Sequence, residues 1–359
     1  MDLFHGMKPL IRVLVFGSIC FSILGCDIGE ADPTPRGRSA PRDKAGTDKA
    51  REAVGIFSRQ FSNFDSKVSH FARGLDGSYY LVVLPSEDSS SSVLMKSTNG
   101  EVWQTLSLPS RTEFGVVRGV AVDAGGNIFV IGSEVGGVFV SKDGGNTYEA
   151  LDFGITSPPL FDKLVSSEDG LVIAASLSEF YVLEEQGATF SKGRWPAGWP
   201  NDSLLVFTSH GQIFTRVLNG TQQGIAGSKN KGQTFTLREA SIAPHFMAKD
   251  STGIIYALDA KGVLLSSTDK GLKFSHLGIV GSDISVIDFA VDANNWLFVL
   301  TPKQLYYSAD GGKVFKALDS KLGLSLGGQE TSTDTYRKMM ILKDRRVLIS
   351  TSNKVFISE

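Results

Sequence analysis

Residues able to recognise a charged ligand recur at one position of a repeated strand pattern in this chain. Seven similar apolar segments can be aligned, and the residue eleven positions before the end of each segment is polar in six of the seven. Such side chains could meet around one axis and bind a ligand or a partner protein; alternatively, they only line a solvated channel mouth. The aligned residues are Ser69, Arg118, Asp162, Ser203, His245, Ile287 and Arg337, of which Arg118, Asp162, His245 and Arg337 are the main candidates.

Further candidate residues lie on loops close to this set. Trp195 and Trp199 belong to the stretch Arg194-Trp-Pro-Ala-Gly-Trp-Pro200, between the third and fourth repeats. Two loop tryptophans often mark a carbohydrate or protein contact, because large flat rings bind at low entropic cost. They could instead cover that end of the domain. The remaining neighbours are Arg111, Asp288 and Tyr336.

The elements that position these residues come from a unit repeated about every 40 residues, a period typical of propellers and solenoids. Each unit has β-branched and aromatic residues bounded by Gly, Asn or Asp, which indicates a strand between turns. The aligned segments end at Tyr80, Phe129, Ile173, Phe214, Tyr256, Phe298 and Leu348.

An earlier strand precedes each of these segments and is apolar at adjacent positions. Because neighbouring residues of a strand point to opposite faces, this strand is expected to be buried on both sides. Its small residues suit the crowded centre of a propeller. Eight positions before the segment ends stand Ala72, Ala121, Val165, Val206, Ala248, Ala290 and Met340.

A short turn also recurs, as in Ser141-Lys-Asp-Gly-Gly-Asn-Thr-Tyr148. It resembles the Asp-box of BNR-repeat proteins, Ser-x-Asp-x-Gly-x-Thr-Trp, and the resemblance covers most of residues 90 to 320. It implies a β-propeller and a structural role for the turns, in which side chains bond the turn backbone and glycine supplies a positive φ. The key residues of the four fullest copies are Asp143, Asn230, Asp269 and Asp310.

These patterns predict an all-β fold, a seven-bladed propeller of four-stranded antiparallel blades; six or eight blades are the alternatives. The seventh unit has no fourth strand before the sequence ends at Glu359. We therefore expect residues 54–64 to supply the outer strand of the last blade and to close the ring.

The N-terminus resembles that of a bacterial lipoprotein. Lys8 and Arg12 flank an apolar run over residues 13–24, which is too short to span a bilayer and suits a signal peptide. The run ends in Ile23-Leu-Gly-Cys26, which resembles the lipobox, so Cys26 is the expected lipidation site. The expected organisation is a signal peptide over 1–25, a lipidated flexible tether over 26–53 and the propeller over 54–359.

Composition narrows the functional classes. The net charge of −2 argues against general nucleic-acid binding. Only Cys20 and Cys26 are present, and Cys20 lies within the expected signal, so the mature body should hold no disulfide. No metal-ligand cluster, nucleophile elbow or phosphate loop is recognisable, and we expect neither a cofactor nor a metal.

The sequence favours a non-enzymatic scaffold over an enzyme. We expect a monomeric propeller, lipid-anchored to the inner or outer membrane of a bacterial envelope, facing the periplasm or the exterior, and binding an envelope protein or a glycan. The photosystem II assembly and stability factor family is similar in architecture. The alternative is a glycan-active enzyme of sialidase or lyase type. Arg118 and Arg337 could join a sialidase arginine triad, but the Phe/Tyr-Arg-Ile-Pro motif and a Tyr/Glu pair are missing.

Overall fold

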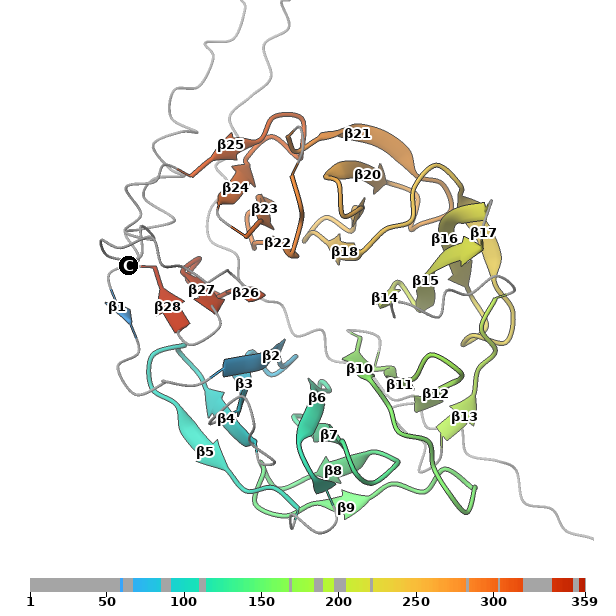
Figure 1. Ribbon diagram of the computed structural model, residues 1–359, viewed down its shortest axis with the longest axis vertical. Coiled ribbons are helices and arrows are strands. Elements are labelled where there is room, and N and C mark those ends of the chain that lie inside the picture. The colour runs from blue at the N-terminus through green and yellow to red at the C-terminus, as the bar shows by residue number, and fades with distance from the viewer. Residues whose placement is uncertain are drawn as a thin grey trace, which may run out of the picture. The chain divides into compact units, whose positions relative to one another are not determined.

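The chain forms a seven-bladed β-propeller. The computed structural model describes residues 59–60, 67–84, 92–109, 114–167, 170–183, 190–196, 205–219, 222–281, 284–302, 304–318, 338–350 and 355–358. These residues build seven four-stranded antiparallel sheets that follow one another around a ring (Figure 1). The predicted fold class and the number of blades are confirmed. No helix among the described residues is long and apolar enough to cross a membrane.

The first three blades follow the chain from the innermost to the outermost strand. Blade 1 holds β2 (Lys67–Arg73), β3 (Tyr79–Leu84), β4 (Val93–Ser97) and β5 (Gln104–Leu106). Blade 2 holds β6 (Val117–Val122), β7 (Ile128–Gly132), β8 (Phe139–Ser141) and β9 (Glu149–Ala150). Blade 3 holds β10 (Lys163–Ser166), β11 (Val172–Ala175), β12 (Phe180–Leu183) and β13 (Phe190–Lys192).

The remaining blades repeat this order, except that the last takes one strand from the other end of the chain. Blade 4 holds β14 (Val206–Ser209), β15 (Gln212–Asn219), β16 (Gln222–Ser228) and β17 (Thr236–Glu239). Blade 5 holds β18 (Phe246–Lys249), β19 (Ile255–Leu258), β20 (Val263–Ser267) and β21 (Ser275–Ile279). Blade 6 holds β22 (Asp288–Val291), β23 (Leu297–Leu300), β24 (Leu305–Ser308) and β25 (Lys316–Ala317), and blade 7 holds β26 (Lys338–Ile341), β27 (Val347–Ser350), β28 (Val355–Ile357) and β1 (Arg59–Gln60).

The ring closes through the segment that the sequence singled out. In blade 7, Arg59 pairs with Ile357 and Gln60 pairs with Phe356 in antiparallel register. The outer strand of the last blade thus comes from within residues 54–64, as predicted. This pairing covers the edge of β28 and ties the last blade to the segment that precedes the first.

The core lies between the blades. The second strands β7, β11, β19, β23 and β27 are buried at every residue, because each sheet is packed on both faces by its neighbours. One apolar cluster, for example, joins Phe129 and Val140 of blade 2 to Leu164, Val172 and Tyr181 of blade 3. Burial of such side chains stabilises a fold by roughly 1.5–3 kcal/mol each, so contacts between neighbouring blades contribute to holding the ring together.

The register of blade 4 differs from that of the other blades by one residue. Val206 aligns with Ala72, which pairs with Tyr80, but Phe207 is the residue that pairs with Phe214. The cause is a shorter hairpin, in which only His210 and Gly211 separate the paired residues Ser209 and Gln212. Both residues have positive φ, at 53° and 69°, as a two-residue turn of the primed type requires.

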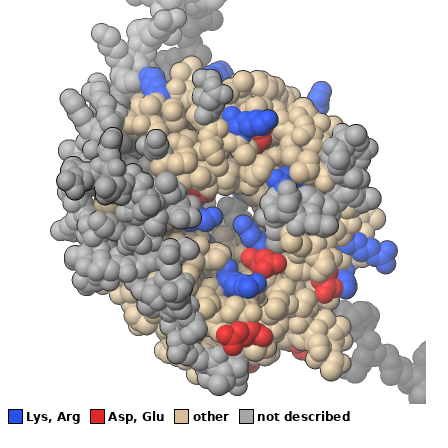
Figure 2. Space-filling view, viewed as in Figure 1, with Lys and Arg blue, Asp and Glu red and all other residues tan. Residues whose placement is uncertain are grey.

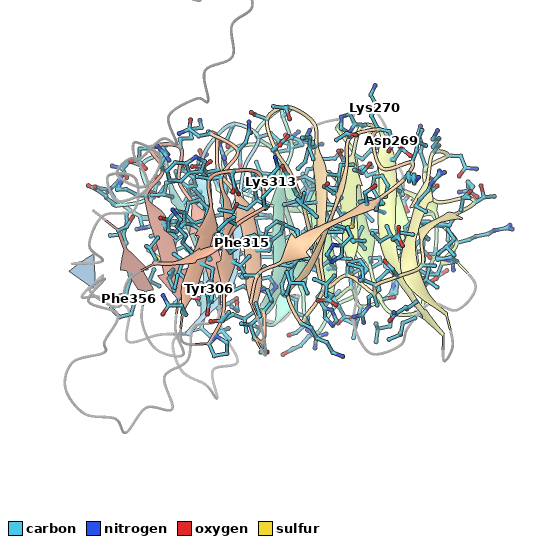
Figure 3. The ribbon with its side chains drawn as sticks, turned by 90° about the horizontal axis from the view of Figure 1, so that it is seen from above. Asp269, Lys270, Tyr306, Lys313, Phe315 and Phe356 are labelled. Atoms are coloured by element: carbon cyan, nitrogen blue, oxygen red, sulfur yellow. The ribbon has the colours of Figure 1, made fainter. Side chains whose placement is uncertain are left out.

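The repeated turns join the two outer strands and are held by their own side chains. In blade 2, Ser141 Oγ donates to Asp143 Oδ1 over 2.8 Å and accepts from the Gly145 N–H over 2.8 Å. Asp143 Oδ1 also accepts from the backbone N–H groups of Asn146 and Thr147. The turns around Asn230, Asp269 and Asp310 contain corresponding serine and backbone contacts. In the side view, Asp269 and Lys270 lie at one edge of the ring and Phe356 lies near the other (Figure 3).

Candidate binding site at the central channel

Charged side chains from separate blades meet where the innermost strands begin. Lys163, Asp288 and Lys338 are the first residues of β10, β22 and β26. The three strands come from blades 3, 6 and 7 and are the innermost strands of their blades, so their first residues lie around the central opening (Figure 1). The charges of Asp288 and Lys338 contribute to the pKa shift of Lys163, although blade 3 is adjacent to neither of their blades. Figure 2 shows Lys and Arg side chains gathered around this central opening, with a few carboxylates beside them.

The channel environment shifts the pKa values of these groups. Lys163 is exposed and Asp288 and Lys338 are half-buried, yet protein surrounds them on the sides, as expected in a narrow water-accessible channel. Burial raises the pKa of Asp288, against the opposing effects of Lys338 and of hydrogen bonds from the backbone N–H groups of Phe289 and Met339. Burial also lowers the pKa of Lys163, with a further lowering from Lys338.

His70 joins this group from blade 1. Its Nδ1 lies 3.3 Å from Ser69 Oγ, and Ser69 Oγ donates in turn to the carbonyl of Val82 over 3.3 Å. Burial, followed by the positive charges of Lys338 and Lys163, lowers the pKa of His70 to about 4. His70 is therefore neutral at physiological pH, and the positive charge of the channel comes from the lysines.

Two of the predicted residues form an ion pair close to this channel. Arg118, the second residue of β6, places Nη1 3.1 Å from Asp162 Oδ1. The two side chains are 44% and 47% exposed, so the pair contributes at most about 1 kcal/mol to stability. Because the two charges neutralise each other, the pair adds little net charge to the channel mouth.

His245 lies beside an arginine that the sequence analysis did not select. The Nε2 atom of His245 is 2.9 Å from Nη1 of Arg216. Arg216 belongs to β15 and is only 2% exposed, whereas His245 precedes β18 and is exposed. The contact joins blades 4 and 5. Nothing in the sequence of β15 pointed to Arg216, because the residues around it follow the ordinary pattern of a second strand in a blade.

Trp195 packs at the outer rim of the ring, where it covers part of the core. Its ring centroid lies 4.2 Å from that of Phe180, at the border between blades 3 and 4. The preceding Arg194 donates its N–H to the carbonyl of Gly232, which belongs to the repeated turn of blade 4. These contacts hold one part of the indole against the core, and its role in binding stays a prediction. Trp199, Arg111, Tyr336, Arg337 and Cys26 lie outside the described residues.

The strongest channel residues stand one position later than the predicted set. The charged residues whose pKa values respond to one another stand ten positions before the segment ends, and alternate residues of a strand share a face. The set eleven positions before the segment ends stays a prediction. The same alignment read ten positions before the segment ends would have found His70, Lys163, Asp288 and Lys338. Asp288 alone was named from the sequence, as a neighbour.

A separate cavity of about 310 Å³ lies between blades 2 and 3. Phe129, Val140 and Val172 form part of its apolar wall, and Lys142 and Glu149, which form an ion pair, line its polar side. Within the described parts of the chain, no three His, Cys, Asp or Glu side chains gather closely enough to hold a metal ion.

The architecture has solved counterparts, although no protein-family model and no curated protein matches the chain. YCF48 from Cyanidioschyzon merolae is similar, with a TM-score of 0.60 and 14% identity over 84% of this chain and 97% of that one. YCF48 bound to D1 peptide gives a TM-score of 0.59 at 12% identity, over 86% and 98% of the two chains. A streptogramin B lyase gives 0.61 at 13% identity, over 84% and 96%. At these identities the likeness shows the fold alone.

Proposed function

We propose that this chain is a non-enzymatic scaffold of a bacterial envelope, anchored by lipid at Cys26, whose propeller binds an extended segment of a partner protein. The observation that carries the proposal is the convergence of Lys163, Asp288 and Lys338 in the channel at the start of the inner strands. The repeated turns resemble the Asp-box of BNR-repeat propellers, and the lipobox-like Ile23-Leu-Gly-Cys26 supports membrane anchoring.

Exposed apolar side chains on the loops next to β10 and β11 favour a peptide as the ligand. Leu160 is 46% exposed and stands two residues before Asp162, on the connection that leads into β10. Leu177 is 38% exposed and stands two residues after Ala175, the strand partner of Lys163. Exposed apolar groups next to desolvated charges are a combination that suits a peptide with both apolar and charged side chains. A solved complex of the similar propeller YCF48 with D1 peptide adds support from fold analogy.

Site-specific photocrosslinking in the native envelope tests this proposal. A photoreactive amino acid at Leu160 or Leu177 should capture one partner protein, and mass spectrometry should map the crosslink to one segment of it. The matched control is Val314, which is 54% exposed but lies in the turn between β24 and β25, the outer strands of blade 6. Equal capture from Val314, or capture from neither leucine, would argue against a partner site at the channel face.

An enzyme of lyase type is the second candidate, because a streptogramin B lyase shares the fold. One activity assay can test both this candidate and a sialidase-like activity on glycans. Turnover of a glycan or lactone panel by the full chain, abolished by Arg118→Ala, would replace the scaffold with an enzyme. If the chain is a scaffold, neither the wild-type chain nor Arg118→Ala should turn over any of these compounds.

A further inference from the structure

Among the described residues that begin the innermost strands, cations outnumber carboxylates in one group of three. Lys163 and Lys338 begin β10 and β26 of blades 3 and 7, and Asp288 begins β22 of blade 6, so all three lie around the central opening (Figure 1). Both lysines contribute to the pKa shift of Asp288. Asp288 is itself bonded by backbone, because its Oδ1 accepts from the Phe289 N–H over 2.9 Å and its Oδ2 from the Met339 N–H over 2.7 Å. Counted at formal charge, two lysines and one carboxylate leave one positive charge over in this group of three.

Neither lysine is held by an ion pair within the described part of the chain. The described ion pairs of the ring involve other cations, such as Arg118 with Asp162 and Lys96 with Asp76. An ammonium group has three donors and forms its strongest hydrogen bonds with anionic oxygen. Protein walls around a channel also strengthen an attraction that bulk water would weaken.

We propose that the channel is an oxyanion site, in which Lys163 and Lys338 together hold a carboxylate of the bound ligand. This inference rests on the proposed function, since a peptide supplies such a group as an acidic side chain or as its C-terminus. A free organic acid offers the same chemistry. The incoming carboxylate supplies the negative charge that the pair of lysines lacks, while Asp288 stays bonded to the backbone.

His70 is a built-in reporter for this site. The positive charges of Lys338 and Lys163 help to lower its pKa, so an anion placed between the lysines should raise that pKa. In the full chain with carbon-13 labelled histidine rings, sulfate should raise the pKa of His70 by about one pH unit relative to chloride at equal ionic strength. Sulfate is the probe because it stays ionised throughout the titration. His276, on the outer strand β21, should not respond.

A lysine variant completes the test. Lys338→Met should raise the pKa of His70 without sulfate and should remove the response to sulfate, whereas Lys313→Met on an exposed outer turn should change neither. A sulfate response that survives Lys338→Met would overturn the proposal, as would its absence from the wild-type chain. If Lys338→Met leaves the pKa of His70 unchanged, the lysine does not face the channel and the proposal is wrong.

A separate competition experiment identifies the source of the carboxylate. If the ligand is a peptide, acidic peptides should compete with sulfate more strongly than their amidated, neutral counterparts do. Competition by citrate but by neither peptide would assign the site to a free organic acid. That result would remove the proposed peptide scaffold while keeping the oxyanion site, so the two proposals fail separately.

Discussion

Replacing Gly271 with alanine should destabilise the propeller through two separable effects. Gly271 has φ of +78°, a left-handed conformation that costs an L-residue roughly 1–2 kcal/mol. A Cβ there would also lie 2.3 Å from Cζ and 2.5 Å from Cε1 of the Phe214 ring in the preceding blade. Phe214 is fully buried and has little room to move, so overpacking adds roughly 1–3 kcal/mol. The expected total is about 2–5 kcal/mol.

Gly311→Ala is the matched control for the backbone effect. Gly311 belongs to the equivalent turn of blade 6 and has φ of +74°, but nothing lies within 4 Å of a Cβ built on it. Only the conformational effect should remain, so this variant should lose about 1–2 kcal/mol. The chain itself tolerates Lys270 at this turn position, with φ of +60°.

Urea denaturation of the two variants and the wild-type chain measures the difference. The free energy of unfolding should fall further for Gly271→Ala, with the slope against urea concentration unchanged. Equal losses for both variants would refute the idea that the turn glycine is needed for contact with the neighbouring blade.

Three more outcomes follow from the structure. Deleting residues 54–64, which contain β1, should lower the melting temperature far more than deleting residues 30–50, and equal losses would contradict closure through this strand. Hydrogen bonds from Thr147 and Ser141 hold the pKa of Asp143 well below its usual range, so the stabilising effect of its carboxylate is present above about pH 4 and is lost as the pH falls further. Asp143→Asn should therefore lower the melting temperature at pH 7. In acid, thermal melts should show the melting temperatures of variant and wild type converging. Cys26→Ala should abolish incorporation of a clickable fatty acid in cells and release the protein from membranes, and unchanged labelling would exclude Cys26 as the lipidated residue.

The fold could be predicted well from the sequence because aligning the repeated segments shows directly which residues of each repeat correspond. Seven aligned strand segments and one missing outer strand were enough to place the closure, now seen as Arg59 and Gln60 paired to β28. The different register of blade 4 comes from the hairpin at His210 and Gly211, because one residue fewer in a turn shifts every later pairing, and the alignment by fixed spacing could not show this.

The site was only partly predictable. The alignment found the ring of inner-strand starts but selected Asp162, which pairs with Arg118, and missed its neighbour Lys163. Which side chain enters a channel depends on strand twist and on the approach of distant blades, and a single sequence reports neither. The contact of Arg216 with His245 joins two blades and likewise leaves no local pattern.

The most direct test of the account is the affinity of the channel for the captured partner segment. A synthetic peptide with the sequence crosslinked at Leu160 should bind the full chain in a one-to-one complex by calorimetry. Charge-assisted hydrogen bonds contribute roughly 1.5–3 kcal/mol each, so the double variant Lys163→Met with Lys338→Met should weaken binding about a hundredfold or more, while Lys313→Met should not. Equal affinity for all three proteins would contradict peptide recognition at the central channel.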